Sequence, residues 1–210
     1  MLRIILLKAG AEKTRVLNKS LKQLFDEFQT SLKITVSSSG KFPPDIGSIL
    51  GRVFRNSKAL VFIKVDCYYA SIQNCSLLPL EGLVDGFVAS SATLKGLRTL
   101  LLPGNGIGTN EDMAKALMMM TGLRVLDLSM NKMGPSGSAL LAPSLMALTG
   151  LNTLDLWDND IGPAGAASLA PSLMALTGLH ALGLSNNGIS SEVTASLKHS
   201  LARKGLCWLG

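Results

Sequence analysis

The second half of the chain repeats itself with a period of 26 to 28 residues. Its four segments share the pattern L-x-x-L-x-L-x-x-N-x-[IM] and start at Leu97, Leu123, Leu151 and Leu179. Two linking stretches, 142–150 and 170–178, have the identical sequence APSLMALTG. Self-similarity at a fixed period of this length is typical of repeat architectures, in which each period forms one unit that stacks on the next.

The recurring residue types of this unit have distinct physical roles. Leu126 and Leu128 are two residues apart, so on a strand their side chains face the same side. Leu123 and Met133 are predicted to close the same interior. The asparagine stands where the chain leaves the strand. Its amide is predicted to bond backbone groups of its own repeat unit, which we call a coil, and of the next coil. It occurs at Asn105, Asn131, Asn159 and Asn187.

Between the strands the apolar spacing becomes helical. The positions are Leu140, Leu141, Leu145 and Leu148 in one unit, and Leu169, Leu173 and Leu176 in the next. Gly-Pro pairs at 134–135 and 162–163 predict helix starts, and Thr-Gly pairs at 149–150 and 177–178 predict helix ends. Stacked strands lie about 4.8 Å apart and packed helices about 9 Å apart, so the stack should bend. The sequence therefore predicts an α/β solenoid with a curved parallel sheet on the concave side and helices outside.

This pattern resembles the ribonuclease-inhibitor-like class of leucine-rich repeats. That class includes ribonuclease inhibitor, the Ran GTPase-activating protein and the sensor region of NOD-like receptors. The resemblance covers residues 97–205, about half of the chain. It implies a leucine-rich-repeat solenoid that binds another protein on its concave sheet without catalysis. It also implies two alternatives, a GTPase-activating protein of the Ran type and the ligand-sensing end of a larger innate-immune-like receptor.

Residues 1–96 carry a weaker form of the same pattern and are predicted to be degenerate repeats or an N-terminal cap, before the regular repeats of 97–210. One segment begins at Leu60 but has Tyr68 at the asparagine position, and another begins at Leu2. The segment from Leu32 alternates in a register that the motif does not predict. A separate small α/β domain ending near residue 58 is the alternative. A fifth start is expected at Leu206, and since both ends fall inside the pattern, we expect a longer protein or a larger assembly.

Charge is unevenly divided along the chain. Residues 1–96 contain 13 Lys and Arg against 7 Asp and Glu, whereas residues 97–210 contain 7 of each, so the first part carries the whole net charge of +6. This excess leaves open a ribonucleoprotein subunit that docks through its basic N-terminal half. The competing interpretation places four of these charges on the solvated face of a helix: Lys13, Arg15, Lys19 and Lys22.

Other classes of function find little support in the sequence. No apolar stretch approaches the roughly 18 residues that a membrane-spanning helix needs, so no membrane span is expected. The three cysteines are scattered without metal-ligand spacing, which predicts no metal site and a reduced, cytoplasmic environment. The segment 104–108 is interpreted as a turn of the repeat and not a phosphate loop, and no nucleophile motif is present. The chain is thus predicted to be no enzyme and to need no cofactor.

The candidate partner-binding residues lie on the strands and on the turns that follow them. In the motif, the third, fifth, seventh and eighth residues are predicted to face away from the core. The selected residues are Leu101, Val125, Asp127, Thr153, Asp155, Trp157 and Asp158. An exposed Trp157 surrounded by three carboxylates predicts contact with a basic segment of a protein partner. The alternative for Trp157 is that its side chain packs against a neighbouring turn or flank.

Asp127 and Asp155 occupy the same motif position in adjacent units. They should therefore be neighbours about 5 Å apart across the sheet, where one pKa would be raised. The alternatives for this pair are that it is merely solvated or, least favoured, that it acts in acid–base catalysis.

Overall fold

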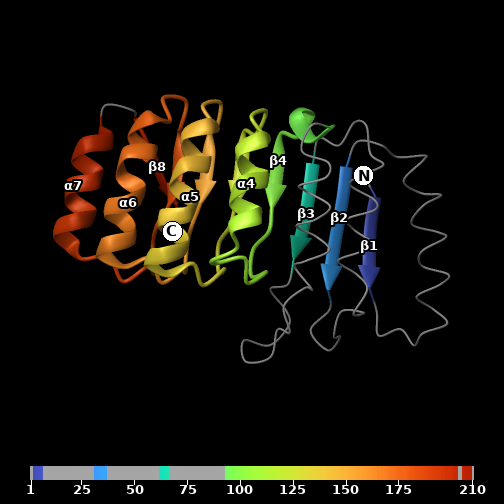
Figure 1. The fold of residues 1–210 in the computed structure, drawn as a ribbon, viewed down its shortest axis with the longest axis horizontal. Coiled ribbons are helices and arrows are strands. Elements are labelled where there is room, and N and C mark those ends of the chain that lie inside the picture. Colours follow the sequence, from blue (N-terminus) through green and yellow to red (C-terminus); the bar gives the residue numbers. More distant parts are fainter. Residues whose placement is uncertain (1, 7–30, 37–61, 67–92, 203–204, 210) are drawn as a thin grey trace.

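The computed structural model describes residues 2–6, 31–36, 62–66, 93–202 and 205–209, with side chains from residue 95 onward. These segments form one sheet of eight parallel strands in sequence order (Figure 1). The strands are β1 (Leu2–Leu6), β2 (Ser31–Val36), β3 (Phe62–Asp66), β4 (Thr99–Leu101), β5 (Val125–Asp127), β6 (Thr153–Asp155), β7 (Ala181–Gly183) and β8 (Cys207–Leu209). A 3-10 turn, η1 (Thr93–Gly96), precedes β4.

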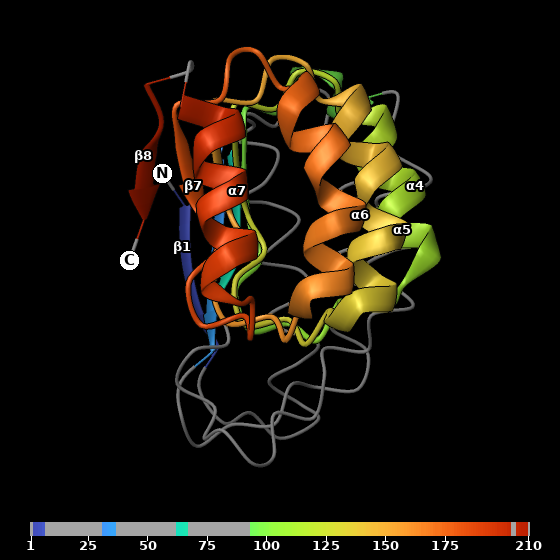
Figure 2. The same cartoon turned by 90° about the vertical axis from the view of Figure 1, so that its left-hand side faces the viewer.

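Each regular repeat continues from its strand into a helix. The helices are α4 (Glu111–Met119), α5 (Gly134–Ala147), α6 (Gly162–Ala175) and α7 (Ser191–Leu201). Figure 2 shows them on one side of the sheet, with α4, α5 and α6 side by side. The Gly-Pro pairs start α5 and α6 as predicted, whereas both helices end shortly before the Thr-Gly pairs. Within the described residues, no helix is both long and apolar enough to cross a membrane.

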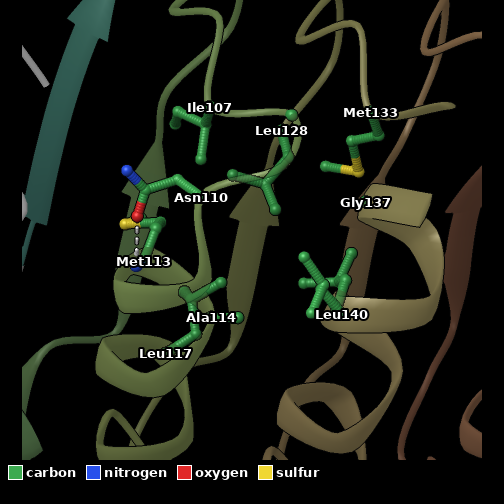
Figure 3. A pocket seen from close by; sticks show the side chains of 11 residues that line it. Ile107, Asn110, Met113, Ala114, Leu117, Leu128, Met133, Gly137 and Leu140 are labelled. Carbon is green, nitrogen blue, oxygen red and sulfur yellow. Dashed lines mark hydrogen bonds between the residues drawn. The ribbon is translucent and has the colours of Figure 1, made fainter.

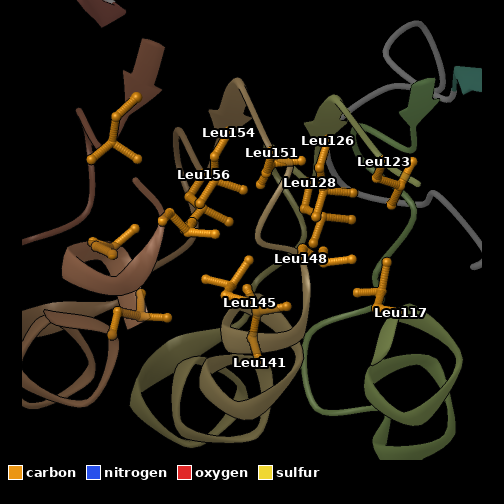
Figure 4. Close-up of a cluster of buried hydrophobic side chains, with 14 of the residues drawn as sticks. Leu117, Leu123, Leu126, Leu128, Leu141, Leu145, Leu148, Leu151, Leu154 and Leu156 are labelled. Carbon is orange, nitrogen blue, oxygen red and sulfur yellow. The ribbon is translucent and has the colours of Figure 1, made fainter. Parts of the chain in front are cut away.

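The core lies between the sheet and the helices. Leu126, Leu154 and Leu182 are in register on adjacent strands, and each is 0% exposed. The leucines of neighbouring coils form one continuous cluster with those of the helices (Figure 4). This arrangement confirms the predicted α/β leucine-rich-repeat fold, in which each coil buries its leucines against the next.

The buried asparagines form a ladder along the stack. The side chain of Asn131 accepts hydrogen bonds from the backbone N–H groups of Asn105 (2.9 Å) and Ile107 (3.1 Å). Its amide group donates to the carbonyls of Leu102 (2.9 Å) and Ser129 (3.1 Å). Asn131 therefore joins its own coil to the preceding one, and the prediction that the amide reaches the next coil was wrong. The oxygen points backward because the N–H groups of the preceding turn converge on it.

Two positions at the ends of the sheet differ from the predicted register. Trp208 pairs with Leu182 and packs against the core, so Trp208, rather than Leu209, takes the inner strand position. The fifth unit therefore does not start at Leu206. At the other end, Leu2 is in register with Leu32, which pairs with Ile63, so Leu2 is not the first leucine of a unit. Ile63 pairs with the inner leucine of the next strand, Leu100, which agrees with a unit that begins at Leu60.

The first three strands extend the sheet of the regular repeats. Tyr68 lies outside the described residues, and so do 16–28 and 46–54, where the apolar spacing of the sequence predicts helices. The predicted division of the chain into 1–96 and 97–210 therefore stays a prediction.

A glycine on α5 sets how closely that helix approaches the neighbouring coil. A Cβ atom added at Gly137 would lie 2.0 Å from the backbone carbonyl oxygen of Gly108. We expect Gly137→Ala to lower the free energy of unfolding by about 2 kcal/mol, because a backbone contact of this kind is relieved only by moving the helix. Gly178→Ala is the control, since its added Cβ meets only ordinary contacts of 3.6 Å or more. Urea denaturation of the two variants tests the prediction, and equal midpoints would contradict it.

Candidate functional site

The candidate site is the open face of the sheet, which we define as the face opposite the helices. All seven predicted residues are partly exposed there or on the turns that follow: Leu101, Val125, Asp127, Thr153, Asp155, Trp157 and Asp158. The register places Leu101, Asp127 and Asp155 in one cross-strand row. Val125 and Thr153 stand in a second row beside it. For the seventh motif position the prediction was wrong in the first two regular units, where Pro103 and Ser129 are buried. It was right in the next two, where Trp157 is partly exposed and Ser185 is exposed.

Asp127 and Asp155 are neighbours in the register, as predicted. The Oδ1 atom of Asp127 accepts hydrogen bonds from the backbone N–H (2.9 Å) and the hydroxyl (2.7 Å) of Ser129. The Oδ1 atom of Asp155 accepts one from the backbone N–H of Trp157 (3.0 Å). An aspartate that bonds the N–H two residues later is a common turn device, and the D-x-S and D-x-W spacing in the sequence was the available signal. These bonds hold the two carboxylates in place at the ends of their strands.

The electrostatics of this pair are asymmetric. Burial raises the pKa of Asp155, the hydrogen bond from Trp157 opposes that rise, and the neighbouring charge of Asp127 adds to it. Among the described residues, the ion pairs found are those of Lys115 with Glu111 and Asp112 on α4. The two carboxylates on the sheet therefore have no cationic partner within the described part of the chain.

Gly183 provides the space that the Asp155 carboxylate occupies. A Cβ atom at Gly183 would lie 2.2 Å from Oδ1 of Asp155. The sequence places Gly183 at the same motif position but gives no sign of this role, because it depends on the contact between β6 and β7.

The turn after β6 contains the other two predicted residues. Trp157 is partly buried, so its side chain is less exposed than predicted. Its backbone carbonyl accepts the N–H of Met130 (2.8 Å), which fixes the turn against the preceding coil. Asp158 has a φ of 54° and accepts a hydrogen bond from the side chain of Asn186 in the next coil. The three carboxylates thus each take part in a turn, and none is solvated without structural contacts.

The raised pKa of Asp155 leads to a prediction about stability and pH. A carboxyl group whose pKa is higher in the folded than in the unfolded state stabilises the fold only while it is protonated, so its ionisation reduces stability as the pH rises. Asp155→Asn keeps the acceptor for the Trp157 N–H and removes the charge. We expect the variant to exceed the natural chain by about 0.5 kcal/mol at pH 7, because solvent screens this partly exposed group. The difference should disappear near pH 4.

Thermal or urea unfolding at several pH values measures this effect. Asp160→Asn, which removes an exposed carboxylate from the same coil, is the control. A gain for Asp155→Asn that persists unchanged at pH 3 would contradict the prediction.

Two cavities lined by described residues lie elsewhere. One between α4 and α5 has a volume of about 20 Å³ and is lined by Ile107, Met113 and Gly137 among others (Figure 3). It has room for at most a water molecule. A larger one of about 510 Å³ lies beside α7, where the ammonium of Lys198 is 5.2 Å from the ring centroid of Trp208. Both cavities lie apart from the carboxylate row on the open face.

The comparison with protein families agrees with this geometry. A family model described as "Leucine Rich repeat" matches residues 121–142 and 148–170, which hold β5, β6 and parts of α5 and α6. No curated protein matches the sequence. The chain therefore contains leucine-rich repeats and has an α/β leucine-rich-repeat fold.

Proposed function

We propose that this chain is a non-enzymatic scaffold of the ribonuclease-inhibitor-like class, which binds a basic segment of a partner protein on the open face of its sheet. The observation that carries the proposal is the pair Asp127 and Asp155, two adjacent carboxylates with no cation beside them among the described residues. Like charges directly opposite one another on neighbouring strands cost stability. A bound cationic side chain would offset that cost.

Trp157 and Asp158 extend the same surface. Both are partly exposed on the turn directly after Asp155, so a segment that reaches the carboxylate pair also reaches the indole. A partly buried tryptophan beside charged groups is typical of residues that dominate binding energy at protein interfaces. Val125 and Thr153 supply an uncharged row next to the carboxylates.

A lysine-rich probe tests the proposal. We expect the peptide acetyl-Gly-Lys-Lys-Gly-Lys-Lys-Gly-amide to bind the full chain at low ionic strength, with an affinity that falls as salt is added. The double variant Asp127→Asn and Asp155→Asn should weaken binding about tenfold or more, and Trp157→Ala combined with Asp155→Ala should do the same. The matched control, Asp112→Asn, removes a carboxylate from exposed α4. Equal affinities for the control and both double variants would reject the proposal.

A further inference from the structure

One cross-strand row of the sheet holds charged residues that are sorted by sign. This row, which we call the fifth-position row, follows the register from β1 to β8 through Arg3, Lys33, Lys64, Leu101, Asp127, Asp155, Gly183 and Leu209. Three basic residues thus stand on β1–β3, one leucine stands on β4, and two acidic residues stand on β5–β6.

The neighbouring row on one side of the fifth-position row is uncharged. The third-position row runs two residues earlier on each strand and contains no charged residue from β2 to β8. Its members are Ser31, Phe62, Thr99, Val125, Thr153, Ala181 and Cys207. The fifth-position row therefore has an uncharged row on one side, while the row on its other side holds one charged residue of β3, Asp66, paired with Thr35.

The order of the signs is unfavourable for the isolated chain. Opposite charges on adjacent strands attract and like charges repel. An alternating order would have given attractive pairs, whereas the observed register places Arg3 beside Lys33, Lys33 beside Lys64, and Asp127 beside Asp155. The row thus carries two blocks of opposite charge, and a ligand with two matching blocks would neutralise both.

We infer that the open face binds an extended segment of a partner protein that carries an acidic block and a basic block and lies across the strands. The acidic block lies over β1–β3, and the basic block lies over β5–β6. This inference rests on the proposed function, to which it adds the acidic half of the ligand and its direction across the sheet. Asp127 and Asp155 in the same row disfavour a nucleic acid, because phosphates along the row would meet like charge.

The spacing of the strands sets the length of the ligand. Five strand steps separate Arg3 from Asp155, and at about 4.8 Å per step they span roughly 24 Å. An extended chain covers about 3.3–3.6 Å per residue, so about seven or eight residues are needed. The two strand steps from Lys64 to Asp127 correspond to about three residue steps, so about two or three uncharged residues should separate the blocks.

Two peptides of equal composition test the inference on the full chain. The block peptide is acetyl-Glu-Glu-Glu-Ser-Gly-Ser-Lys-Lys-Lys-amide, which is used with its reversed sequence because the direction of the ligand backbone is open. The mixed peptide alternates Glu and Lys around the same Ser-Gly-Ser. We expect the better block peptide to bind at least about tenfold more tightly than the mixed peptide at about 50 mM salt, measured by calorimetry.

Variants on β2 and β3 separate this inference from the proposed function. Lys33→Gln with Lys64→Gln should remove the advantage of the block peptide without weakening the lysine-rich probe. Lys33→Glu with Lys64→Glu should weaken the block peptide further and strengthen the probe. Circular dichroism checks that each variant is folded. If the double glutamate variant does not fold, the double glutamine variant alone tests the inference.

Three outcomes would overturn the inference. The first is equal binding of the block and mixed peptides while the lysine-rich probe still binds, which leaves the proposed function intact. The second is an unchanged block advantage in the Lys33→Gln, Lys64→Gln chain. The third is tighter binding of a ten-nucleotide oligouridylate than of either block peptide. Loss of all peptide binding, including that of the lysine-rich probe, would reject the proposed function as well.

Discussion

Replacing Asn159 by alanine is expected to lower the free energy of unfolding by about 4 kcal/mol, the largest effect of any single polar substitution proposed for this chain. Asn159 is 0% exposed. Its oxygen accepts the N–H of Asn131 (2.9 Å), and its amide donates to the carbonyls of Leu128 (2.8 Å), Leu156 (3.1 Å) and Trp157 (3.2 Å). Alanine removes the side-chain partner of all four groups, at about 1–3 kcal/mol for each group left unsatisfied. The Trp157 carbonyl still accepts the N–H of Met130, so the loss comes from the other three.

Urea denaturation followed by circular dichroism measures this loss, and two further variants define its cause. Asn152→Ala removes an exposed asparagine from the same coil and should change stability by less than about 0.5 kcal/mol. Asn159→Asp keeps an acceptor for the N–H of Asn131 but loses the donors to the three carbonyls, so it should also be strongly destabilising. If Asn159→Ala unfolds at the same urea concentration as Asn152→Ala, the asparagine ladder does not stabilise the stack.

Leu154→Ala is expected to cost about 3–5 kcal/mol, because it opens a cavity in the middle of the core. Leu154 is 0% exposed and lies in register between Leu126 and Leu182, so the coils on both sides lose contacts. The repeat limits relaxation, since the strand of each coil is held by hydrogen bonds to both neighbours. The variant should unfold at a clearly lower urea concentration than the natural chain.

The matched control for Leu154→Ala is Met146→Ala. It also shortens a large apolar side chain, but Met146 is 54% exposed on α5. We expect the control to change stability by less than about 0.5 kcal/mol. A similar loss for both variants would mean that burial in the stacked coils is not what stabilises this region.

Much of the fold could be predicted because periodicity alone reveals it. The two-residue spacing of Leu126 and Leu128 and the recurring asparagine identified the strand and its exit, and the helical leucine spacing identified α5 and α6. The Gly-Pro pairs gave the helix starts, since the structure begins α5 and α6 at those glycines. The strand register at the ends of the sheet was harder to predict. Trp208 takes the inner position because it packs against the core, and the leucine motif does not indicate this.

The sequence predicted which residues of the candidate site are adjacent on neighbouring strands, but not how their side chains are packed. Equal motif positions placed Asp127 beside Asp155, and the structure confirms this register. The pKa of Asp155 is raised first by burial, which the sequence did not indicate, and only then by the charge of Asp127. The partial burial of Trp157 and the space that Gly183 leaves for Asp155 were not predictable. Both depend on how the turn of one coil meets the strand of the next.

The sequence by itself determined the repeating coil, its buried leucines and its asparagine, because these follow from spacings of two, three and four residues within one unit. Only the tertiary structure decided which residues of different coils share a row. Coils of unequal length can slide against one another by a residue, and each such step exchanges the inner and outer faces of a strand. The fifth-position row from Arg3 to Asp155 is therefore a property of the assembled sheet, because the packing of whole coils sets the register.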